Sequence, residues 1–346
     1  MSRVRRVFVA FVMVFAALPV LVGAGGDAAR SEHQRIVEFW TPERVAQAVP
    51  REIVLDGSGQ FQLARPTHHR PGHGGGPPGG GGGDVGGGSV TGASWTGGGT
   101  IADTEGKVLF ALGSNYYVCS ATLVDDFRTG ESLVLTAGHC VYDNENNVFA
   151  TNWMFIPNYD ADPEPLTTNG SFCSGTLYGC WTADALVVHD GFASEPGFTE
   201  GAILHDFAFA VLGPGGHSGN SIADNALGDQ AIQFSAITEG FVHAFGYPHA
   251  RPYNGTDLVY CAGNVGFDAN FGNQTYGLAC NMTGGASGGG WFITFNEATG
   301  EGTLMSVNSY KYSNDRNKMY GPKFNSDTED VYNAAGGASS NTIVGP

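Results

Sequence analysis

The feature that most constrains the fold of this chain is a series of short apolar runs downstream of residue 100. Each run is rich in β-branched or aromatic residues and is bounded by Gly, Asn, Asp or Pro, which is the pattern of a β-strand. The runs cover residues 107–112, 116–124, 133–136, 153–156, 185–188, 207–212, 241–245, 258–261, 291–295 and 304–310. A helical period appears only over residues 328–335. Strands without interleaved helices predict one two-lobed all-β unit, built as an antiparallel barrel or sandwich.

The N-terminus has the composition of a secretory signal. A start rich in arginine is followed by an apolar run over residues 7–22 and by small residues at 23–25. No later stretch approaches the ~20 apolar residues that a membrane span needs. The sequence therefore predicts a signal peptide over residues 1–25 and a secreted, extracellular protein without stable membrane association.

Two segments separate this signal from the strand-rich region. Residues 72–99 are dominated by glycine and bury almost nothing, so they are predicted to form a flexible linker. Residues 26–71 contain one helix start, with Thr41 as the cap and Pro42 at the first helical position, but are too few for a core of their own. We expect a removable prosegment over 26–71 and a folded domain over 100–346.

All six cysteines lie downstream of residue 100, and an even number in an exported chain suggests three disulfides. Several connectivities are possible, and the simplest pairs neighbours: Cys119–Cys140, Cys173–Cys180 and Cys261–Cys280. No CxxC pair or close histidine pair suggests a metal site in this region, so neither a metal nor another cofactor is expected. An acidic loop could hold calcium, but without the fixed spacing of a dedicated site it is interpreted as solvated; it contains Asp143, Asn144, Glu145 and Asn147.

The formal net charge of −17 narrows the classes of partner. Binding to phosphate groups needs clustered Lys and Arg side chains. We therefore expect neither nucleic acid nor an anionic membrane as the main partner. An acidic balance also keeps an extracellular protein soluble, and it says nothing about catalysis.

The first candidate for chemistry is Ser287, which lies among glycines in residues 283–291. Glycines permit the sharp turn that presents a nucleophile with backbone N–H groups facing a ligand. The same stretch alone is also consistent with an ordinary turn between strands. A serine hydroxyl needs a histidine base that a carboxylate orients, so the interpretation depends on partners elsewhere in the chain.

His139 and Asp206 are the candidate partners of this serine. His139 follows a predicted strand, and a tether from the adjacent Cys140 to Cys119 would stabilise its turn by about 3 kcal/mol. Asp206 heads an apolar strand, where a carboxylate is costly to bury unless a group such as a histidine N–H binds it. Asp190 is the alternative carboxylate, but a glycine follows it instead of a strand.

The order of these residues separates two classes of hydrolase. Residues 285–289 also match the Gly-x-Ser-x-Gly turn of α/β-hydrolases, which need a histidine after the serine. The last histidine here is His249, which excludes that class. The order His139, Asp206, Ser287 is the one that the chymotrypsin-like double β-barrel uses.

The motifs around these residues resemble those of the trypsin-like (chymotrypsin-fold) serine endopeptidases. They are CSATLV at 119–124, TAGHC at 136–140, HDFAFAVL at 205–212, FGYP at 245–248 and MTGGASGGGW at 282–291. The closer likeness is to the secreted bacterial branch near the glutamyl-endopeptidase-like enzymes, and it covers about residues 106–310. It implies two antiparallel six-stranded β-barrels, to which the helical pattern near the end of the chain adds a short C-terminal helix.

The same resemblance assigns chemical roles. His139 would be the general base and then the general acid, Asp206 would orient it, and Ser287 would attack a peptide carbonyl. The backbone N–H groups of Gly285 and Ser287 would form the oxyanion hole, where losing one donor typically costs about 100-fold to 1000-fold in turnover. The expected substrate is a protein or peptide, and the expected state is a monomer. Two alternatives stay open: a catalytically silent protein of this fold that binds a partner, or an esterase with the same triad.

Ala286 departs from the animal members of the family. Those members have an Asp at this position, which pairs with the N-terminus that activation frees. Activation through such an ion pair is therefore not expected here. If the protein is a zymogen, the segment before the glycine linker should cause its latency. Gly290 stands where many relatives have Pro, which changes backbone stiffness more than chemistry.

The substrate pocket is the least determined part of the site. The resemblance places Ser309 and Tyr310 against the substrate backbone and Asn281 near the pocket floor. No Asp occupies that floor, so a trypsin-like preference for Arg or Lys is not supported. Asn308 replaces the histidine that glutamyl endopeptidases use in this strand. Lys311 could attract an acidic side chain or be a solvated surface lysine.

Overall fold

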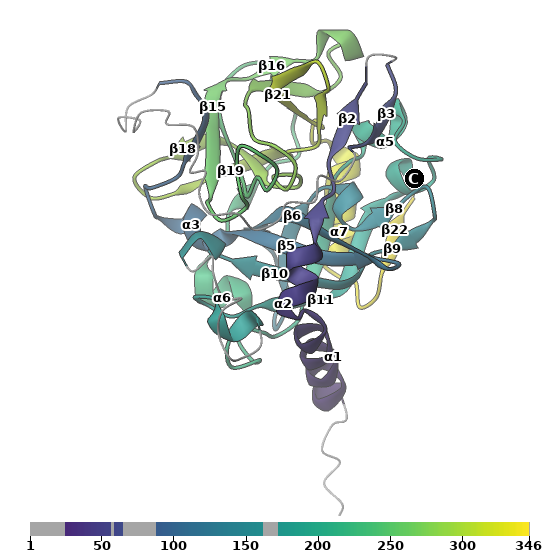
Figure 1. Ribbon diagram of the computed structural model, residues 1–346, viewed down its shortest axis with the longest axis vertical. Coiled ribbons are helices and arrows are strands. Elements are labelled where there is room, and N and C mark those ends of the chain that lie inside the picture. The colour runs from purple at the N-terminus through teal and green to yellow at the C-terminus, as the bar shows by residue number, and fades with distance from the viewer. Residues whose placement is uncertain (1–24, 57–58, 65–87, 162–171, 346) are drawn as a thin grey trace, which may run out of the picture.

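The computed structural model describes residues 25–56, 59–64, 88–161 and 172–345. The expected signal peptide therefore lies almost entirely outside the described residues. The strands form two lobes, one above the other in Figure 1, and short helices cover their outer faces. Within the described ranges, no helix has the length and apolar character that crossing a membrane requires.

The first lobe is a closed antiparallel barrel of six strands, in the order β6-β5-β10-β11-β12-β7 and back to β6. These strands are β5 (Glu105–Leu112), β6 (Asn115–Val124), β7 (Ser132–Thr136), β10 (Thr151–Pro157), β11 (Trp181–His189) and β12 (Ala208–Leu212). Every residue of β5, β7 and β12 is buried, as expected of strands inside a closed barrel. Two short strands pair with the barrel in parallel, β1 (Val49–Pro50) with β6 and β22 (Thr342–Val344) with β11.

The second lobe consists of two six-stranded sheets. One contains β13 (Ala231–Ile232), β19 (Glu301–Val307), β18 (Gly290–Asn296), β14 (Phe241–Gly246), β15 (Val259–Asn264) and β4 (Val90–Ser94) in spatial order. The other contains β16 (Gly266–Phe267), β17 (Tyr276–Ala279), β21 (Asp315–Gly321), β20 (Tyr310–Tyr312), β2 (Ile53–Leu55) and β3 (Phe61–Leu63). The architecture is the expected chymotrypsin-like one, with added strands from the N-terminal part of the chain.

The predicted linker was too long at its C-terminal end. Residues 90–94 form β4, which pairs with β15 in the second lobe. Trp95 follows and is only 7% exposed, because its ring packs edge-on against Phe245, Tyr260 and Phe295. The folded domain therefore begins about ten residues before residue 100.

The predicted strand over residues 304–310 is divided in two. β19 ends at Val307 and β20 begins at Tyr310. Between them, the N–H of Asn308 donates to Gly289 and the N–H of Ser309 donates to Tyr320. The chain leaves one sheet for the other at this point, a change of partner that the alternation of side chains does not reveal.

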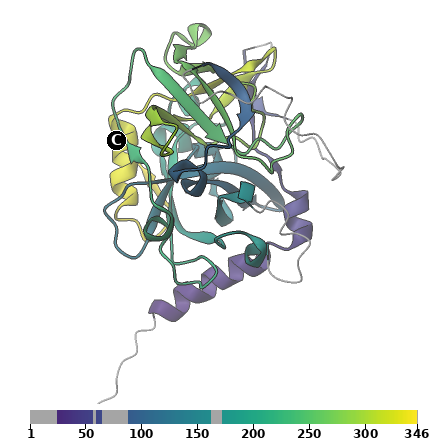
Figure 2. The same cartoon turned by 90° about the vertical axis from the view of Figure 1, so that its left-hand side faces the viewer.

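The described residues of the predicted prosegment, up to 56 and 59–64, form helices and strands that pack on the two lobes. Helices α1 (Gly25–Phe39) and α2 (Pro42–Gln47) lie along the outside of the first lobe (Figures 1 and 2, purple). Trp40 fixes them there, since it is 1% exposed and its indole N–H donates to the Asn152 carbonyl at 2.7 Å. As expected, the Thr41 side chain caps α2.

The remaining helices are short and peripheral. They are α3 (Thr100–Thr104), α4 (Asp190–Ala193), α5 (Glu200–Leu204), α6 (Ala223–Leu227) and α7 (Ser326–Ala335). The last of them corresponds to the predicted C-terminal helix, begins with a capping box at Asn325, and packs on β11 and β12. A two-stranded ribbon, β8 (Tyr142–Asp143) with β9 (Val148–Phe149), follows the histidine turn.

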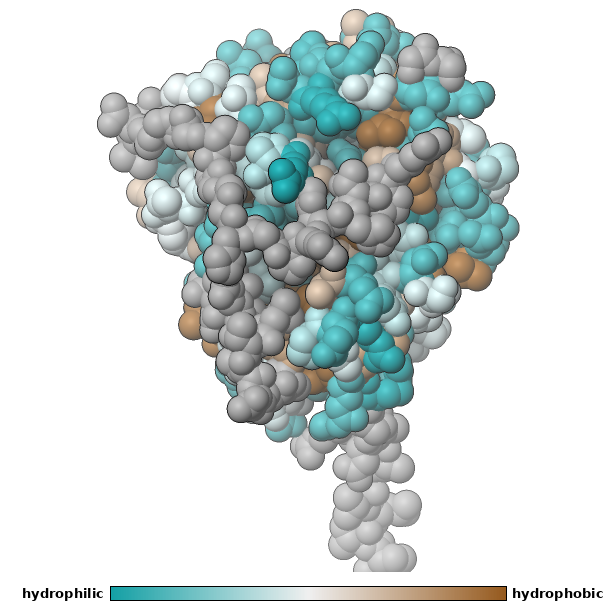
Figure 3. All heavy atoms as spheres, in the orientation of Figure 1, coloured by the Kyte–Doolittle hydropathy of each residue, from teal (hydrophilic) through white to brown (hydrophobic). Residues whose placement is uncertain are grey.

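The surface and the disulfides agree with a stable extracellular domain. Hydrophobic residues show only as small separate patches among hydrophilic ones on the described face of Figure 3. The disulfides join neighbours along the chain: Cys119–Cys140, Cys173–Cys180 and Cys261–Cys280. These bridges are typical of an oxidising compartment.

Candidate active site

Strand pairing in the first lobe brings His139 and Asp206 together. In the antiparallel register of β7 and β12, Thr136 lies opposite Ala208, so the residues just beyond the two strand ends are neighbours. His139 sits on a 3₁₀ turn (Gly138–Cys140) directly after β7. The Cys119–Cys140 disulfide ties this turn to β6.

Asp206 is completely buried and binds three donors. Its Oδ1 accepts the backbone N–H of His139 at 2.8 Å, and its two oxygens lie 3.0 and 2.9 Å from His139 Nδ1. Its Oδ2 accepts the Ser309 hydroxyl at 2.5 Å. A buried carboxylate is tolerated when its oxygens are satisfied in this way, and here it fixes the imidazole ring. Asp190, the alternative carboxylate of the sequence analysis, instead begins α4.

The serine turn packs against the first lobe through its glycines. The backbone at Gly285 and Gly288 has φ of +104° and +85°, which favours glycine. A Cβ atom at Gly288 would lie 2.2 Å from Thr136 Oγ1, so no larger residue fits there. The N–H of Ser120 donates to the Ser287 carbonyl at 2.7 Å. These contacts bring Ser287 to the histidine turn, 4% exposed.

Asn308 holds the same turn from the other side. Its amide donates to the carbonyls of Phe245 and Ala286 at 2.7 and 3.0 Å and accepts the Trp291 indole N–H at 2.7 Å. The residue that replaces a histidine in the resemblance is therefore a buried support of the serine turn. In these bonds the Asn308 side chain contacts two backbone carbonyls and the indole of a core tryptophan.

One backbone carbonyl lies against both His139 and Ser287. His139 Nε2 is 3.0 Å from the Arg51 carbonyl oxygen, and the Ser287 hydroxyl donates to that oxygen at 3.2 Å. Arg51 belongs to the predicted prosegment. Sequence reasoning did not find this contact, because nothing in the local pattern of residues 49–55 indicates where an extended segment will dock.

The candidate pocket residues have different surroundings. Ser309 faces the Asp206 carboxylate, as described. Tyr310 is buried, its hydroxyl bonds to Asp268 and Thr275, and burial raises the pKa of that phenol. Asn281 accepts the Tyr253 hydroxyl. The structure thus gives each of these three side chains a partner, either within the second lobe or at Asp206.

Lys311 is buried, 4% exposed, and is not a solvated surface lysine. Its Nζ donates to the carbonyls of Cys280 and Arg316 at 2.9 and 2.6 Å. Burial lowers the pKa of the Lys311 ammonium to about 8, while attraction to the carboxylates of Glu52 and Asp315 opposes that shift. The sequence could not decide whether Lys311 is solvated or buried, and only the structure shows that it is buried.

The acidic loop that could have held calcium has other contacts. Asn144 is buried and donates to the carbonyls of Phe192 and Gly197. Asp143 lies 3.7 Å from the Arg51 guanidinium. Within the described residues, the one His/Cys/Asp/Glu group compact enough for a metal is His139 with two cysteines, and those cysteines form a disulfide.

A double-lobed β structure with a serine turn facing a histidine-aspartate pair defines the chymotrypsin-fold class of serine proteases. No family model matches the chain, and no curated protein matches it. Solved structures do match it, and two serine proteases are among them. The protease Anisep from Arthrobacter nicotinovorans is 36% identical, with 69% of this chain and 98% of that chain covered and a TM-score of 0.57. A thermostable serine protease, AL20, from an extremophilic microorganism is 34% identical, with 69% and 99% covered and a TM-score of 0.58.

A third structure, a Glu endopeptidase in complex with MPD, shares the fold at 18% identity, with 72% of this chain and 98% of that chain covered and a TM-score of 0.52. The identity and coverage of the first two are sufficient to place the chain. It belongs to the chymotrypsin-fold serine proteases and is a serine endopeptidase related to the glutamyl endopeptidases.

Proposed function

We propose that the chain is the precursor of a secreted serine endopeptidase that cleaves peptide bonds through an acyl-enzyme on Ser287. The observation that carries the proposal is the buried contact between His139 and Asp206 beside the serine turn, at 2.9 Å. In the form without its prosegment, His139 would take the proton of the Ser287 hydroxyl as it attacks and later return a proton to the leaving amine. We expect it to act outside the cell as a monomer.

The carbonyl oxygen of the substrate would develop negative charge near the N–H groups of Gly285 and Ser287. Fixed donors in a site shielded from water stabilise such charge more than water does. The Gly285 carbonyl is held by the Ser120 hydroxyl at 2.9 Å, which supports a fixed orientation of the serine turn. The acyl part of the substrate would run along β20, and the leaving part would lie beside β6.

The finer proposal is a preference for an acidic side chain in the pocket that precedes the cleaved bond. Lys311 follows the pocket residues Ser309 and Tyr310 directly and shares strand β20 with Tyr310. A buried cation needs an opposite charge nearby. In the precursor, the first carboxylate acting on it is Glu52, which lies two residues before Val54, the register partner of Lys311. After removal of the prosegment, a substrate carboxylate would take this place.

Trapping the acyl-enzyme tests the proposed chemistry. Processed protein mixed with an activated ester should release a burst of leaving group equal to the enzyme concentration, and mass spectrometry should find the acyl group on Ser287. A peptide library cleaved by the same protein tests the preference. Cleavage after Glu should exceed cleavage after Gln by about 10-fold or more, the value of one charge-assisted contact. Steady hydrolysis without a burst, with no acyl group on Ser287, would refute the mechanism.

A further inference from the structure

The prosegment crosses the catalytic cleft from the first lobe to the second. Val49 and Pro50 pair with Tyr117 and Val118 of β6, and Ile53 pairs with Tyr310 of β20. Between these two pairings lies the Arg51 carbonyl, against the base and the nucleophile. In Figure 1 this purple segment passes from the strands of the lower lobe to those of the upper one.

We propose that residues 49–55 keep the protease latent by occupying the cleft in the direction opposite to that of a substrate, with the Arg51 guanidinium held in a dedicated pocket. The inference rests on the proposed function, because it takes the substrate's acyl part to lie along β20. A bound substrate chain, followed from its N-terminus, would then run from the second lobe to the first. The prosegment runs from the first lobe to the second, and both of its strand pairings are parallel.

The contacts of the Arg51 carbonyl explain why the bound segment is not cleaved. The Ser287 hydroxyl donates to this carbonyl oxygen at 3.2 Å, and the same oxygen lies 3.0 Å from His139 Nε2. The Arg51 carbonyl therefore stands against both side chains and engages the hydroxyl proton that the imidazole would accept during attack. Within the described residues, the Gly285 and Ser287 N–H groups do not donate to this oxygen. The carbonyl therefore lies outside the geometry of attack.

The guanidinium pocket anchors the reversed segment. Arg51 is 1% exposed, and its Nη1 donates to the carbonyls of His139 at 2.9 Å and Tyr142 at 3.2 Å. Its Nη2 lies 3.7 Å from the Asp143 carboxylate. The aromatic ring of Tyr117 lies 5.7 Å from the guanidinium, within cation–π range. Burial lowers the pKa of this guanidinium, and Asp143 is the first of the charges that oppose the shift.

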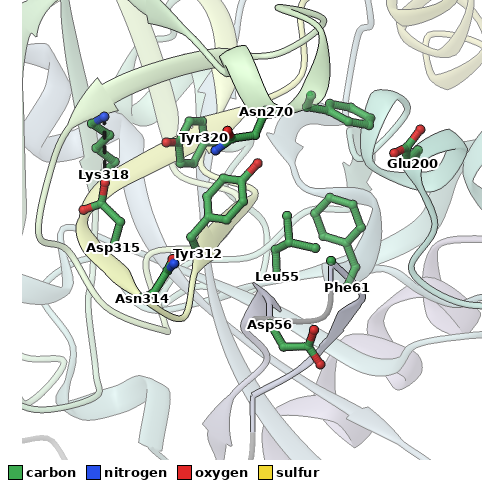
Figure 4. A pocket seen from close by; sticks show the side chains of 12 residues that line it. Leu55, Asp56, Phe61, Glu200, Asn270, Tyr312, Asn314, Asp315, Lys318 and Tyr320 are labelled. Atoms are coloured by element: carbon green, nitrogen blue, oxygen red, sulfur yellow. Dashed lines mark ion pairs between the residues drawn. The ribbon is translucent and has the colours of Figure 1, made fainter.

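A hairpin continues the segment on the second lobe. β2 and β3 are antiparallel, and the Phe61 ring packs edge-on against Tyr310 at 5.2 Å and against Phe271 at 6.1 Å. Beside the hairpin is a pocket of about 620 Å³, into which Tyr312 and Tyr320 point from the second lobe and Leu55 from the prosegment (Figure 4). The hairpin thus covers the edge of β20 along which the acyl part of a substrate would lie.

The covalent connection strengthens this inhibition. The glycine-rich stretch after the prosegment connects it covalently to the protease domain, and a covalent connection of this length keeps a docked segment at about millimolar effective concentration. Cutting that stretch before β4 turns an intramolecular contact into a bimolecular one. Activation would then follow when the cut prosegment dissociates on dilution. It would need no ion pair between a freed N-terminus and residue 286, which is Ala here and cannot form one.

The test uses the full-length chain and a fluorophosphonate probe, whose labelling rate at the intact precursor reports access to Ser287. Arg51→Ala removes two charge-assisted bonds, so labelling should be about 10-fold to 100-fold faster than in the wild-type chain. Arg51→Lys keeps the charge without the forked geometry and should be intermediate. Arg35→Ala, an exposed arginine of α1 that does not reach the cleft, is the matched control and should match wild type.

Equal, fast labelling of all the chains would overturn the reversed inhibition while leaving the protease assignment intact. Absence of labelling in every chain, even after the glycine stretch is cut, would overturn both. A second measurement does not depend on the variants. The Arg51–Glu52 bond of the wild-type precursor should stay intact during activation, and a fragment beginning at Glu52 would show that the segment binds as a substrate.

Discussion

Replacing Asp206 by Asn tests how the buried carboxylate prepares the base. Asp206 accepts three kinds of donor in the structure: the His139 backbone N–H, the His139 ring Nδ1 and the Ser309 hydroxyl. An amide has one oxygen and one NH₂ group. If the amide oxygen in the Asp206→Asn variant keeps accepting the backbone N–H of His139, the amide NH₂ group faces His139 Nδ1 and the Ser309 hydroxyl.

The Ser309 hydroxyl can turn to accept that NH₂ group, and the ring can adapt only by giving up its Nδ1 proton. A neutral imidazole then carries its proton on Nε2, where it cannot accept the proton of Ser287. The same change in the template enzyme of this class costs about 10⁴-fold in turnover. We expect a similar loss here, together with about 1–3 kcal/mol of stability from weakened buried hydrogen bonds.

The assay is the turnover of a small ester by the processed enzyme, with the fluorophosphonate labelling rate as a second readout. Asp190→Asn is the matched control, because it makes the same change in the other candidate carboxylate near this end of the first lobe. It should change turnover by less than about threefold, as expected for a residue outside the triad. A large loss in Asp190→Asn with normal turnover in Asp206→Asn would refute the assignment.

Three further predictions concern the surroundings of the triad. Ser309→Ala should lower turnover by about 10-fold to 100-fold with little change in KM, because one charge-assisted bond to Asp206 is lost; an unchanged rate would contradict its positioning role. Lys311→Met should abolish the Glu-over-Gln preference, and in wild type that preference should fall as pH rises through about 8, since deprotonation removes the cation; a preference that persists at pH 10 would argue against Lys311. Replacing both Cys119 and Cys140 by Ser should cost about 3 kcal/mol of unfolding free energy in the chain-entropy model, measured by denaturant titration against the wild-type chain; an unchanged midpoint would contradict it.

Most of the fold could be predicted because the strands carry their own signals. Runs such as 108–112 and 208–212 are apolar throughout, and both lie in barrel strands whose residues are buried. Chain order then separated the double barrel from the α/β-hydrolases. The division of residues 304–310 was missed because the predicted strand ran through Asn308 and Ser309, although both are residue types common in turns and the chain changes sheets there.

The candidate site was predictable where residue type limits the chemistry. A histidine next to a tethering cysteine, and an aspartate that heads a buried strand, are unusual enough to identify the pair that the structure brings to 2.9 Å. The docking of Arg51 and the burial of Lys311 were not predictable. Each depends on which surface an extended segment or a long side chain meets after folding, and local sequence patterns do not contain that information.

The most direct measurement of the central claim is labelling of the processed protein with a fluorophosphonate, followed by identification of the modified residue. The probe reacts with a serine that a neighbouring base activates. The account predicts stoichiometric labelling on Ser287 and loss of labelling in Ser287→Ala, with that variant still folded as judged by its denaturant midpoint. Labelling that persists in Ser287→Ala, or a folded processed protein that no probe labels, would contradict it.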